Sequence, residues 1–312
     1  MRLIKQKAEL LPWEPGIEGI YKAIEKAGRT CYKSEDKITE GSAKPFVDRM
    51  IASNHLAMLE HGTVYLKMPG QGLLTYTTNH NYENYRTNKY SKVVRRMTYD
   101  NPNDVIGIMY AYITTNLRVL VENGWLDDLK YLCDPTEYHK MRYSFKLTTS
   151  IGVTRELNRH RVHSIAEQST RYCNYSKNKF GSELTFIKPS WFDRRVAVTI
   201  NGKYIPADAK GDFTQEEARL IESLSNAEAS YIYFIKCGWQ PQQAREILPL
   251  CTASEIVHTA FASDWRYFFD LRLFECTGKV HPNMKELAQL MYDEADKQGI
   301  LFDIIYDSRT IN

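Results

Sequence analysis

Segments with the hydrophobic spacing of helices, about 3.6 residues, alternate along the chain with segments that have the two-residue spacing of strands. This alternation constrains the fold more than any other feature of the sequence. Apolar residues recur at helical spacing from Ile17 to Ile24, which predicts an amphipathic helix ending near Ala27. Residues 63–68 alternate in hydrophobicity, as in a half-buried strand. Because such patterns continue without an internal repeat or a clear linker, we expect one mixed α/β domain of the α+β type over residues 1–312.

The remaining elements are predicted from the same periods and from turn and capping residues. Strands are expected at 1–12, 143–149, 184–187 and 256–261, and Asn201-Gly202 predicts a β-hairpin between 196–200 and 203–205. Residues 77–103 show little periodicity, so a long loop is expected there. Helices are expected through 46–50, at 105–123, from Thr214 to Gly238, from Pro241 to Leu248, at 265–273 and from Pro282 to Met291.

Composition favours a soluble protein. The chain is 43% hydrophobic and 25% charged, and its net charge of +3 is too weak to imply nucleic acid by itself. The six cysteines are scattered without zinc-ligand spacing, which predicts reduced thiols and a cytoplasmic location. The spacing of His55, Glu60 and His61 matches neither common zinc-protease motif, so no metal is expected. No stretch approaches the roughly 20 apolar residues that span a membrane, and no signal peptide is recognisable.

Residues 155–171 contain a concentration of basic side chains. Their four arginines have only Glu156 and Glu167 as acidic neighbours. One interpretation is a charged surface segment neutralised by salt bridges. However, an excess of fixed positive charge is costly unless an anion binds there, and the guanidinium fork suits phosphate. Ser164 and Ser169 add neutral donors, so we predict a site for a phosphorylated ligand.

Two other chemistries stay open for the same stretch. A hydrolase would use Ser169 as nucleophile with His160 or His163 as base, although no Gly-x-Ser-x-Gly sequence surrounds this serine. A non-catalytic nucleotide- or RNA-binding protein would combine the basic residues with the Tyr-rich segment 77–103 as a stacking surface.

The order of residues in this stretch resembles the signature of the flavin-dependent thymidylate synthases. The run Arg159-His160-Arg161 is followed by Ser169 and Arg171-Tyr172, with Glu167 also in place. The resemblance implies the family's fold, that of a thymidylate synthase-complementing protein with a central, largely antiparallel sheet flanked by helices. It extends over most of the chain, because further segments resemble family motifs in the expected order: 27–34, 55–61, 244–249 and 268–272.

The resemblance also implies an activity. Members of the family methylate C5 of dUMP to give dTMP, with 5,10-methylenetetrahydrofolate as the carbon donor and FAD, reduced by NADPH, as the hydride source. Their active sites are shared between the subunits of a homotetramer. A small-molecule substrate is therefore expected, with no nucleic acid and no membrane as partner.

The site residues that the resemblance implies fall into two groups. One group would contact FAD: His55, Ala57, Glu60, Arg159, His160, Arg161, Glu167, Phe261, Ser263 and Tyr267. The other would contact dUMP: Glu156, Glu167, Gln168, Ser169, Thr170, Arg171, Arg245 and Arg272. Arg272 is the expected catalytic residue, because a guanidinium beside the uracil would stabilise the N3 anion and raise electron density at C5.

The chain departs from the family pattern at three positions. Ala57 stands where a Ser or Thr is frequent, Glu156 where a Gln is common, and Ala166 where an Asn is common. A hydroxyl contact to the flavin is therefore not expected from residue 57. Residues 77–140 and 194–206 look longer than in short family members, so family-variable insertions are expected there.

Overall fold

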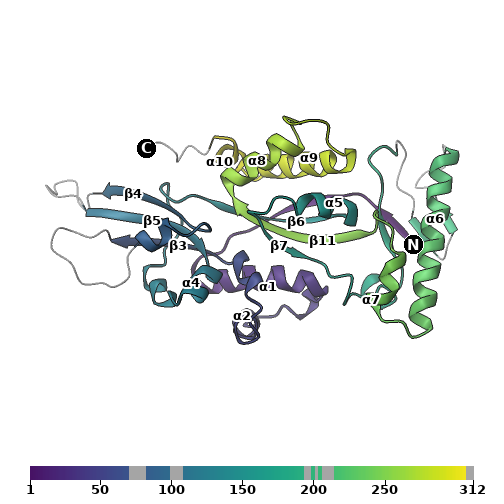
Figure 1. The fold of residues 1–312 in the computed structure, drawn as a ribbon, viewed down its shortest axis with the longest axis horizontal. Coiled ribbons are helices and arrows are strands. Elements are labelled where there is room, and N and C mark those ends of the chain that lie inside the picture. Colours follow the sequence, from purple (N-terminus) through teal and green to yellow (C-terminus); the bar gives the residue numbers. More distant parts are fainter. Residues whose placement is uncertain (70–81, 99–107, 193–197, 201–202, 206–213, 307–312) are drawn as a thin grey trace.

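The structure, a computed structural model, describes residues 1–69, 82–98, 108–192, 198–200, 203–205 and 214–306. These residues form an elongated molecule with a central sheet that helices cover on both faces (Figure 1). A second sheet lies at one end, and helix α6 (Gln215–Lys236) lies at the other (Figure 1). Helices and mainly antiparallel strands alternate along the chain, which confirms the predicted mixed α/β fold.

The central sheet has the strand order β2-β6-β11-β7, and each neighbouring pair is antiparallel. Strand β11 pairs with β6 along its whole length, from Ala253 opposite Ser150 to Phe261 opposite Arg142. The expected central, largely antiparallel sheet is therefore confirmed. Its strands are β2 (Lys7–Leu11), β6 (Arg142–Ser150), β7 (Ser164–Glu167) and β11 (Ala253–Phe261).

Two smaller sheets complete the β structure. The first has the order β3-β5-β4, with β3 (Thr63–Pro69), β4 (Lys92–Thr98) and β5 (Ile108–Asn116), so residues 77–140 supply two of its strands. In the second, β1 and β8 are parallel and the predicted hairpin forms, although its turn at residues 201–202 lies outside the described residues. Its strands are β1 (Arg2–Ile4), β8 (Thr185–Ile187), β9 (Val198–Ile200) and β10 (Lys203–Ile205).

The helices begin and end at capping residues that the sequence supplies. Thr214 and Glu217 form the predicted capping box before α6, and Lys33 ends α1 in a left-handed conformation with φ of 49°. The other α-helices are α1 (Gly16–Tyr32), α2 (Ala43–Ala52), α3 (Glu83–Arg86), α4 (Leu117–Asn123), α5 (Ile151–Leu157), α7 (Pro241–Ala244), α8 (Ala262–Arg272), α9 (Pro282–Lys297) and α10 (Leu301–Tyr306). Short 3₁₀ helices are η1 (Glu35–Lys37), η2 (Leu56–His61), η3 (Leu126–Tyr131), η4 (Asn178–Phe180) and η5 (Arg245–Ile247).

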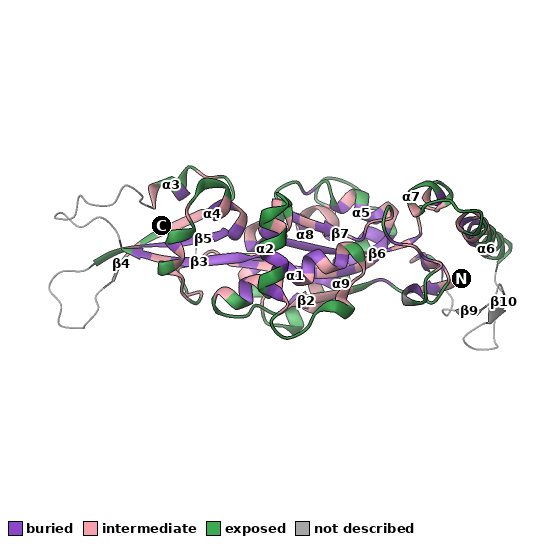
Figure 2. Cartoon of the chain, turned by 90° about the horizontal axis from the view of Figure 1, so that it is seen from below, coloured by how far each residue is buried: buried purple, intermediate pink, exposed green. Residues whose placement is uncertain are grey.

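Both faces of the central sheet are covered. On one face, Phe145 of β6 packs in a cluster with Trp265 and other side chains of α8 and α9. On the opposite face, Ala27 of α1 packs with Ala166 and Val257. Figure 2 shows the central strands largely buried between helices whose outer surfaces are exposed. The ends of β7 and β11 are therefore held by a packed core on both sides.

Three predictions of local structure were wrong. Residues 108–116 form strand β5, so only the last part of the helix expected at 105–123 is helical. Residues 82–98 contain α3 and β4 within the expected loop. Residues 1–12 form two strands in different sheets instead of one. β5 is buried at every residue from Ala111 to Asn116, and a strand buried on both faces lacks the alternation that would have marked it.

Three histidines lie inside the packed centre of the molecule. His61, His163 and His258 are at most 5% exposed. Nδ1 of His163 lies 3.2 Å from Nδ1 of His258, and Nδ1 of His61 lies 2.8 Å from Oγ1 of Thr259. Burial lowers the pKa of His61 and of His163 to about 3, and it lowers the pKa of His258 well below its usual value. The three rings are therefore neutral at pH 7.

These histidines predict a loss of stability in acid. The folded pKa of His163 is about 3, below an unfolded value of roughly 6.5, so the unfolded chain takes up the proton first. Its contribution is fully present above about pH 6.5 and is lost as the pH falls toward 3. Between pH 7 and pH 5 the free energy of unfolding should fall by about 2 kcal/mol for each such histidine, measured by urea denaturation.

The exposed His55 provides the control for this prediction. A His55→Gln variant should keep the whole fall in the free energy of unfolding. A stability that is constant or rises between pH 7 and pH 5 would contradict the burial of neutral histidines.

Candidate functional site

A pocket of about 540 Å³ opens beside the end of β7. Strand β7 supplies Glu167 and the residues that follow it, while α5 and the α7–η5 segment supply the facing wall. Residues 167–171, five consecutive residues predicted to contact dUMP, therefore line the same pocket as Arg245, which is distant in the sequence. The residues lining the pocket are Ile151, Arg155, Glu167, Gln168, Ser169, Thr170, Arg171, Arg245, Glu246, Leu248 and Leu250.

Backbone hydrogen bonds fix the loop that follows β7. The N–H of Gln168 donates to the carbonyl of Glu255 on β11 at 2.8 Å. The N–H of Ser169 donates to the carbonyl of Cys31 at the end of α1, also at 2.8 Å. Two elements of the core therefore hold adjacent residues of the loop.

The basic side chains of this pocket are largely unneutralised. Nη1 of Arg245 donates to Oγ1 of Thr170 at 3.3 Å, and its nearest carboxylate, that of Glu246, is 3.9 Å away and exposed. Within the described part of the chain, no carboxylate lies in ion-pair distance of Arg155 or Arg171. A surface segment neutralised by salt bridges is therefore not what forms here, and the pocket carries a positive field suited to an anion.

Two neutral side chains orient Glu167 at the pocket wall. Nδ2 of Asn158 donates to Oε2 of Glu167 at 3.2 Å, and Oγ of Ser254 donates to Oε1 at 3.4 Å. The sequence analysis missed both residues. Asn158 immediately precedes the Arg159-His160-Arg161 run, but nothing in its spacing predicts a contact with a strand nine residues later.

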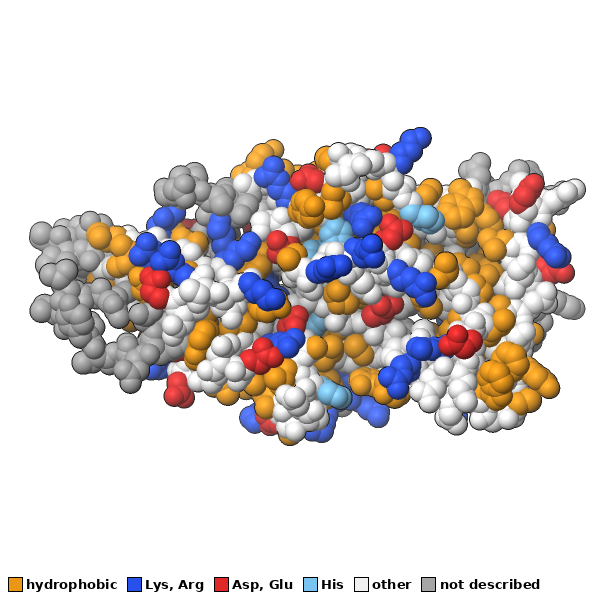
Figure 3. All heavy atoms as spheres, viewed as in Figure 1, with side chains coloured by type: hydrophobic (Ala, Val, Ile, Leu, Met, Phe, Trp, Pro, Cys, Tyr) orange, Lys and Arg blue, Asp and Glu red, His pale blue; other side chains and the backbone are white. Residues whose placement is uncertain are grey.

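The Arg159-His160-Arg161 run forms a turn between α5 and β7. Arg159 and Arg161 are exposed, while the ring of His160 is 7% exposed between them. Burial and the charge of Arg272 lower the pKa of His160 to about 4, so the ring is neutral at pH 7. Figure 3 shows Lys and Arg side chains gathered around histidine near the middle of this face.

Arg272, the last residue of α8, contacts this turn and does not line the 540 Å³ pocket. Its Nε donates to Nε2 of His160 at 3.1 Å, and its Nη1 forms an ion pair with Oε2 of Glu156 at 3.2 Å. Glu156 is likewise absent from the pocket lining. Within one chain, therefore, Glu156 and Arg272, both predicted to contact dUMP, contact each other instead of lining the pocket, and Arg272 also contacts His160 of the predicted FAD group.

The segment of His55 borders a second pocket, of about 400 Å³. His55 and Ala57 line it, and the guanidinium of Arg118, also in the lining, forms an ion pair with Glu60 at 2.5 Å. Apolar and aromatic side chains make up much of the remaining wall: Tyr32, Phe46, Met50, Leu56 and Met58. This pocket contains part of the group expected to contact FAD.

The two pockets meet at the C-terminal end of α1. Cys31 lines the second pocket, while its carbonyl holds Ser169 of the first. The ring of Tyr32 lies 5.5 Å from that of Tyr172, the residue after Arg171. The segment of His55, expected to contact FAD, and residues 167–171, expected to contact dUMP, are therefore close in space although they are far apart in the sequence.

The last three residues of the predicted FAD group lie at the start of α8. Phe261 is buried, and Nζ of Lys92 lies 4.4 Å from the centre of its ring. The same Nζ donates to Oγ of Ser263 at 2.5 Å. Tyr267 is 60% exposed. The contact from Lys92 was not predicted, because β4 was expected to be loop.

Other classes of site receive no support from the geometry. Oγ of Ser169 accepts from the N–H of Arg171, while His160 and His163 are hydrogen-bonded to Arg272 and His258, so neither histidine is hydrogen-bonded to the serine. Among the described residues, no group of three His, Cys, Asp or Glu side chains is arranged to hold a metal. Over the same residues, no helix is long and apolar enough to cross a membrane.

Curated relatives match part of the chain. Flavin-dependent thymidylate synthases from Mycobacterium sp. strains JLS and KMS are each 30% identical to it over 98 residues. These matches cover 31% of this chain and 37% of each relative. The aligned region therefore spans little more than a third of the length of those relatives.

Solved structures resemble the chain weakly over nearly all of its length. A UMP/dUMP methylase, PolB from Streptomyces cacaoi, bound with 5-Br dUMP, covers 100% of both chains at 17% identity and a TM-score of 0.42. Thymidylate synthase X (ThyX) from Helicobacter pylori, with FAD and dUMP, covers 96% of this chain and 99% of its own at 13% identity and a TM-score of 0.37.

A family model matches most of the chain. The model of the thymidylate synthase complementing protein matches residues 91–298. This range includes every residue that lines the 540 Å³ pocket, the Arg159-His160-Arg161 turn and Arg272, whereas His55 lies before it. With the matched range covering more than half of the 312 residues, the chain belongs to the thymidylate synthase complementing protein family.

Proposed function

We propose that this protein is a flavin-dependent thymidylate synthase that methylates C5 of dUMP to give dTMP. The observation that carries the proposal is the lining of the 540 Å³ pocket. Residues 167–171 and Arg245, expected to contact dUMP, line it together although they are distant in sequence. Membership of the family and the unneutralised arginines of this pocket support the same activity.

The pocket provides groups suited to each part of a nucleoside monophosphate. Arg155, Arg171 and Arg245 would bind the phosphate, because the first two are exposed without a carboxylate partner in the described chain and Arg245 has only a distant, exposed one. Ser169 and Thr170 add hydroxyl groups. A fixed carboxylate such as that of Glu167, held by two neutral side chains, would accept hydrogen bonds from the ligand without changing its position.

The residues present fit FAD. Arg159 and Arg161 are exposed cations that would bind the pyrophosphate, and the apolar wall of the second pocket, with His55 at its edge, would accept an aromatic ring. When bound and reduced, FAD would supply the hydride for the methyl group. NADPH as reductant and 5,10-methylenetetrahydrofolate as carbon donor are part of the proposal, as is a cytoplasmic location, which agrees with six free cysteines.

Arg272 is proposed to act on the uracil of a neighbouring subunit. A guanidinium adjacent to N3 stabilises the anion formed when N3 loses its proton, and the added negative charge increases the nucleophilicity of C5. Glu156 and His160 hold Arg272 outside the pocket of its own chain. We therefore propose a homotetramer with shared active sites, in which Arg272 completes the pocket of another subunit.

The proposal as a whole is tested by the absorbance spectrum of the purified protein, followed by anaerobic NADPH oxidation with and without dUMP. Flavin absorbance, together with oxidation that dUMP stimulates, is the expected result. A colourless protein that added FAD cannot reconstitute would contradict a flavin enzyme and leave a plain anion-binding protein.

Removal of one guanidinium from the pocket should weaken nucleotide binding. We expect Arg245→Ala to raise the Kd for dUMP by roughly 10- to 100-fold, because a hydrogen bond to a charged group contributes about 1.5–3 kcal/mol. Isothermal titration calorimetry measures this Kd. The matched control is Arg219→Ala on α6, where the arginine is exposed and paired with Glu222. Equal effects of the two substitutions would exclude Arg245 from the site.

Arg272→Ala separates chemistry from cofactor binding. We expect this variant to retain FAD, because Arg159, Arg161 and the second pocket, which are proposed to bind it, are unaltered, but to lose nearly all methyl transfer. The bound flavin is measured by absorbance and dTMP formation by chromatography. Turnover at the rate of the unaltered protein would remove Arg272 from the mechanism.

A further inference from the structure

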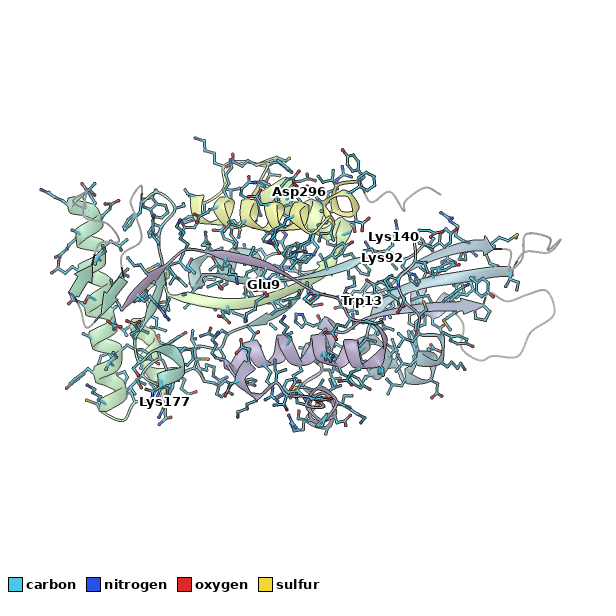
Figure 4. The ribbon with its side chains drawn as sticks, turned by 180° about the vertical axis from the view of Figure 1, so that it is seen from behind. Glu9, Trp13, Lys92, Lys140, Lys177 and Asp296 are labelled. Carbon is cyan, nitrogen blue, oxygen red and sulfur yellow. The ribbon has the colours of Figure 1, made fainter. Side chains whose placement is uncertain are left out.

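A third cavity, of about 260 Å³, lies between α1 and the central sheet. Its walls come from α1, from the end of β2 and residues 12–14, and from the start of β6. Figure 4 shows Trp13 in this region, where the chain passes from β2 to α1. None of the residues lining this cavity lines either of the pockets described above.

The segment between β2 and α1 is packed closely against the helix. A Cβ atom at Gly19 would lie 2.1 Å from the carbonyl oxygen of Glu14, so only glycine permits this approach. The ring of Trp13 meets that of Tyr65 edge-on, with 6.0 Å between centroids. The cavity therefore has a wall held by the packing of the fold, and is not a gap left by a loose segment.

A buried cation without a carboxylate partner lines the cavity. Arg142 is 7% exposed, and no Asp or Glu of the described ranges lies in ion-pair distance of it. Its Nε is buried without a hydrogen-bond partner. Its other donors reach only neutral oxygens, which are the carbonyl of Glu60 at 3.1 Å, Oγ1 of Thr63 at 3.2 Å and Oγ of Ser164 at 3.1 Å. Burial lowers the pKa of Arg142 to about 10, and it outweighs Glu60 and Asp264, which favour the charged form from beyond ion-pair distance. The buried charge is therefore costly, and a bound anion would reduce the cost.

Two lysines of α1 also line the cavity, and they differ in their partners. Nζ of Lys22 forms an ion pair with Glu14 at 2.7 Å. Lys26, one turn further along the helix, has no carboxylate in ion-pair distance among the residues that the structure describes. The one carboxylate in the lining is thus already paired, which leaves Lys26 and Arg142 as cations in excess.

Most of the remaining wall is apolar. Leu10, Leu11, Trp13, Ile20 and Val257 are among the residues that form it. Such a surface favours the hydrocarbon or aromatic part of a ligand, while the two cations favour an acidic group. At 260 Å³ the cavity suits a small molecule rather than a nucleotide with its cofactor.

We propose that this cavity is a binding site for a small amphipathic carboxylate, with its apolar part against Trp13 and Ile20 and its acidic group directed toward Lys26 and Arg142. The site is separate from the proposed catalytic pockets and does not depend on the proposed function. It adds a ligand of a different chemical class from the nucleotide and the flavin.

Calorimetric titration of the full-length protein with 4-phenylbutanoate and with 4-phenylbutanamide tests the proposal. The two probes have the same shape and differ in charge. We expect the carboxylate to bind at least about tenfold more tightly than the amide, because only the carboxylate makes charge-assisted contacts. Saturating dUMP should not displace it, since dUMP is proposed to bind elsewhere.

Substitution of Lys26 identifies the cavity as the site. Lys26→Gln should weaken binding of 4-phenylbutanoate by about fivefold to tenfold. Lys44→Gln on α2 makes the same change of charge at an exposed lysine that does not line the cavity, and should leave the affinity unchanged. Both lysines are on the surface of helices, so neither substitution is expected to prevent folding.

Three results would overturn the proposal. Equal affinity for the carboxylate and the amide would remove the role of charge, and an equal effect of Lys26→Gln and Lys44→Gln would place the ligand elsewhere. Absence of saturable binding up to about 10 mM, a very weak affinity, would show that the cavity does not take this class of ligand.

Discussion

The backbone pairing of β11 between β6 and β7 is the constraint on which the rest of the structure depends. On one side, the carbonyl of Glu255 accepts the N–H of Gln168 and so fixes the loop that lines the pocket. At its other end, β11 leads directly into α8, which carries Arg272 to the Arg159-His160-Arg161 turn. A shift in the register of this strand by one residue would move each of its side chains to the opposite, equally packed face of the sheet and displace both parts of the site together.

Unneutralised charge at the surface contrasts with neutral histidines beneath it. Arg155 and Arg171 of the pocket lack carboxylate partners in the described chain, and Arg245 has only the exposed Glu246 at 3.9 Å, so the excess positive charge costs stability in the absence of an anion. Within the turn, His160 is kept neutral by burial and by Arg272, so it accepts a hydrogen bond instead of adding another positive charge. This arrangement concentrates positive charge where a phosphate would bind and limits repulsion in the core.

The local features of the fold were predictable, and the long-range contacts were not. Capping residues such as Thr214 and the hairpin at 198–205 follow from neighbouring residues, and residues 167–171 share a pocket because they are contiguous. By contrast, β5 reads as a helix because its burial on both faces removes the strand period. The contacts of Asn158 with Glu167, of Lys92 with Ser263 and of Glu156 with Arg272 depend on tertiary geometry that no local pattern encodes.

The central claim is that the arginine-lined pocket at the end of β7 recognises the phosphate of a nucleotide, and a comparison of dUMP with deoxyuridine by calorimetry tests it most directly. Charge-assisted contacts to the phosphate from even two of the three arginines predict a Kd for dUMP about 100-fold or more below that for deoxyuridine, with a difference that shrinks as salt is added. Equal affinities for the two compounds would contradict the claim, because they would show that the guanidinium groups of Arg171 and Arg245 do not contact the phosphate.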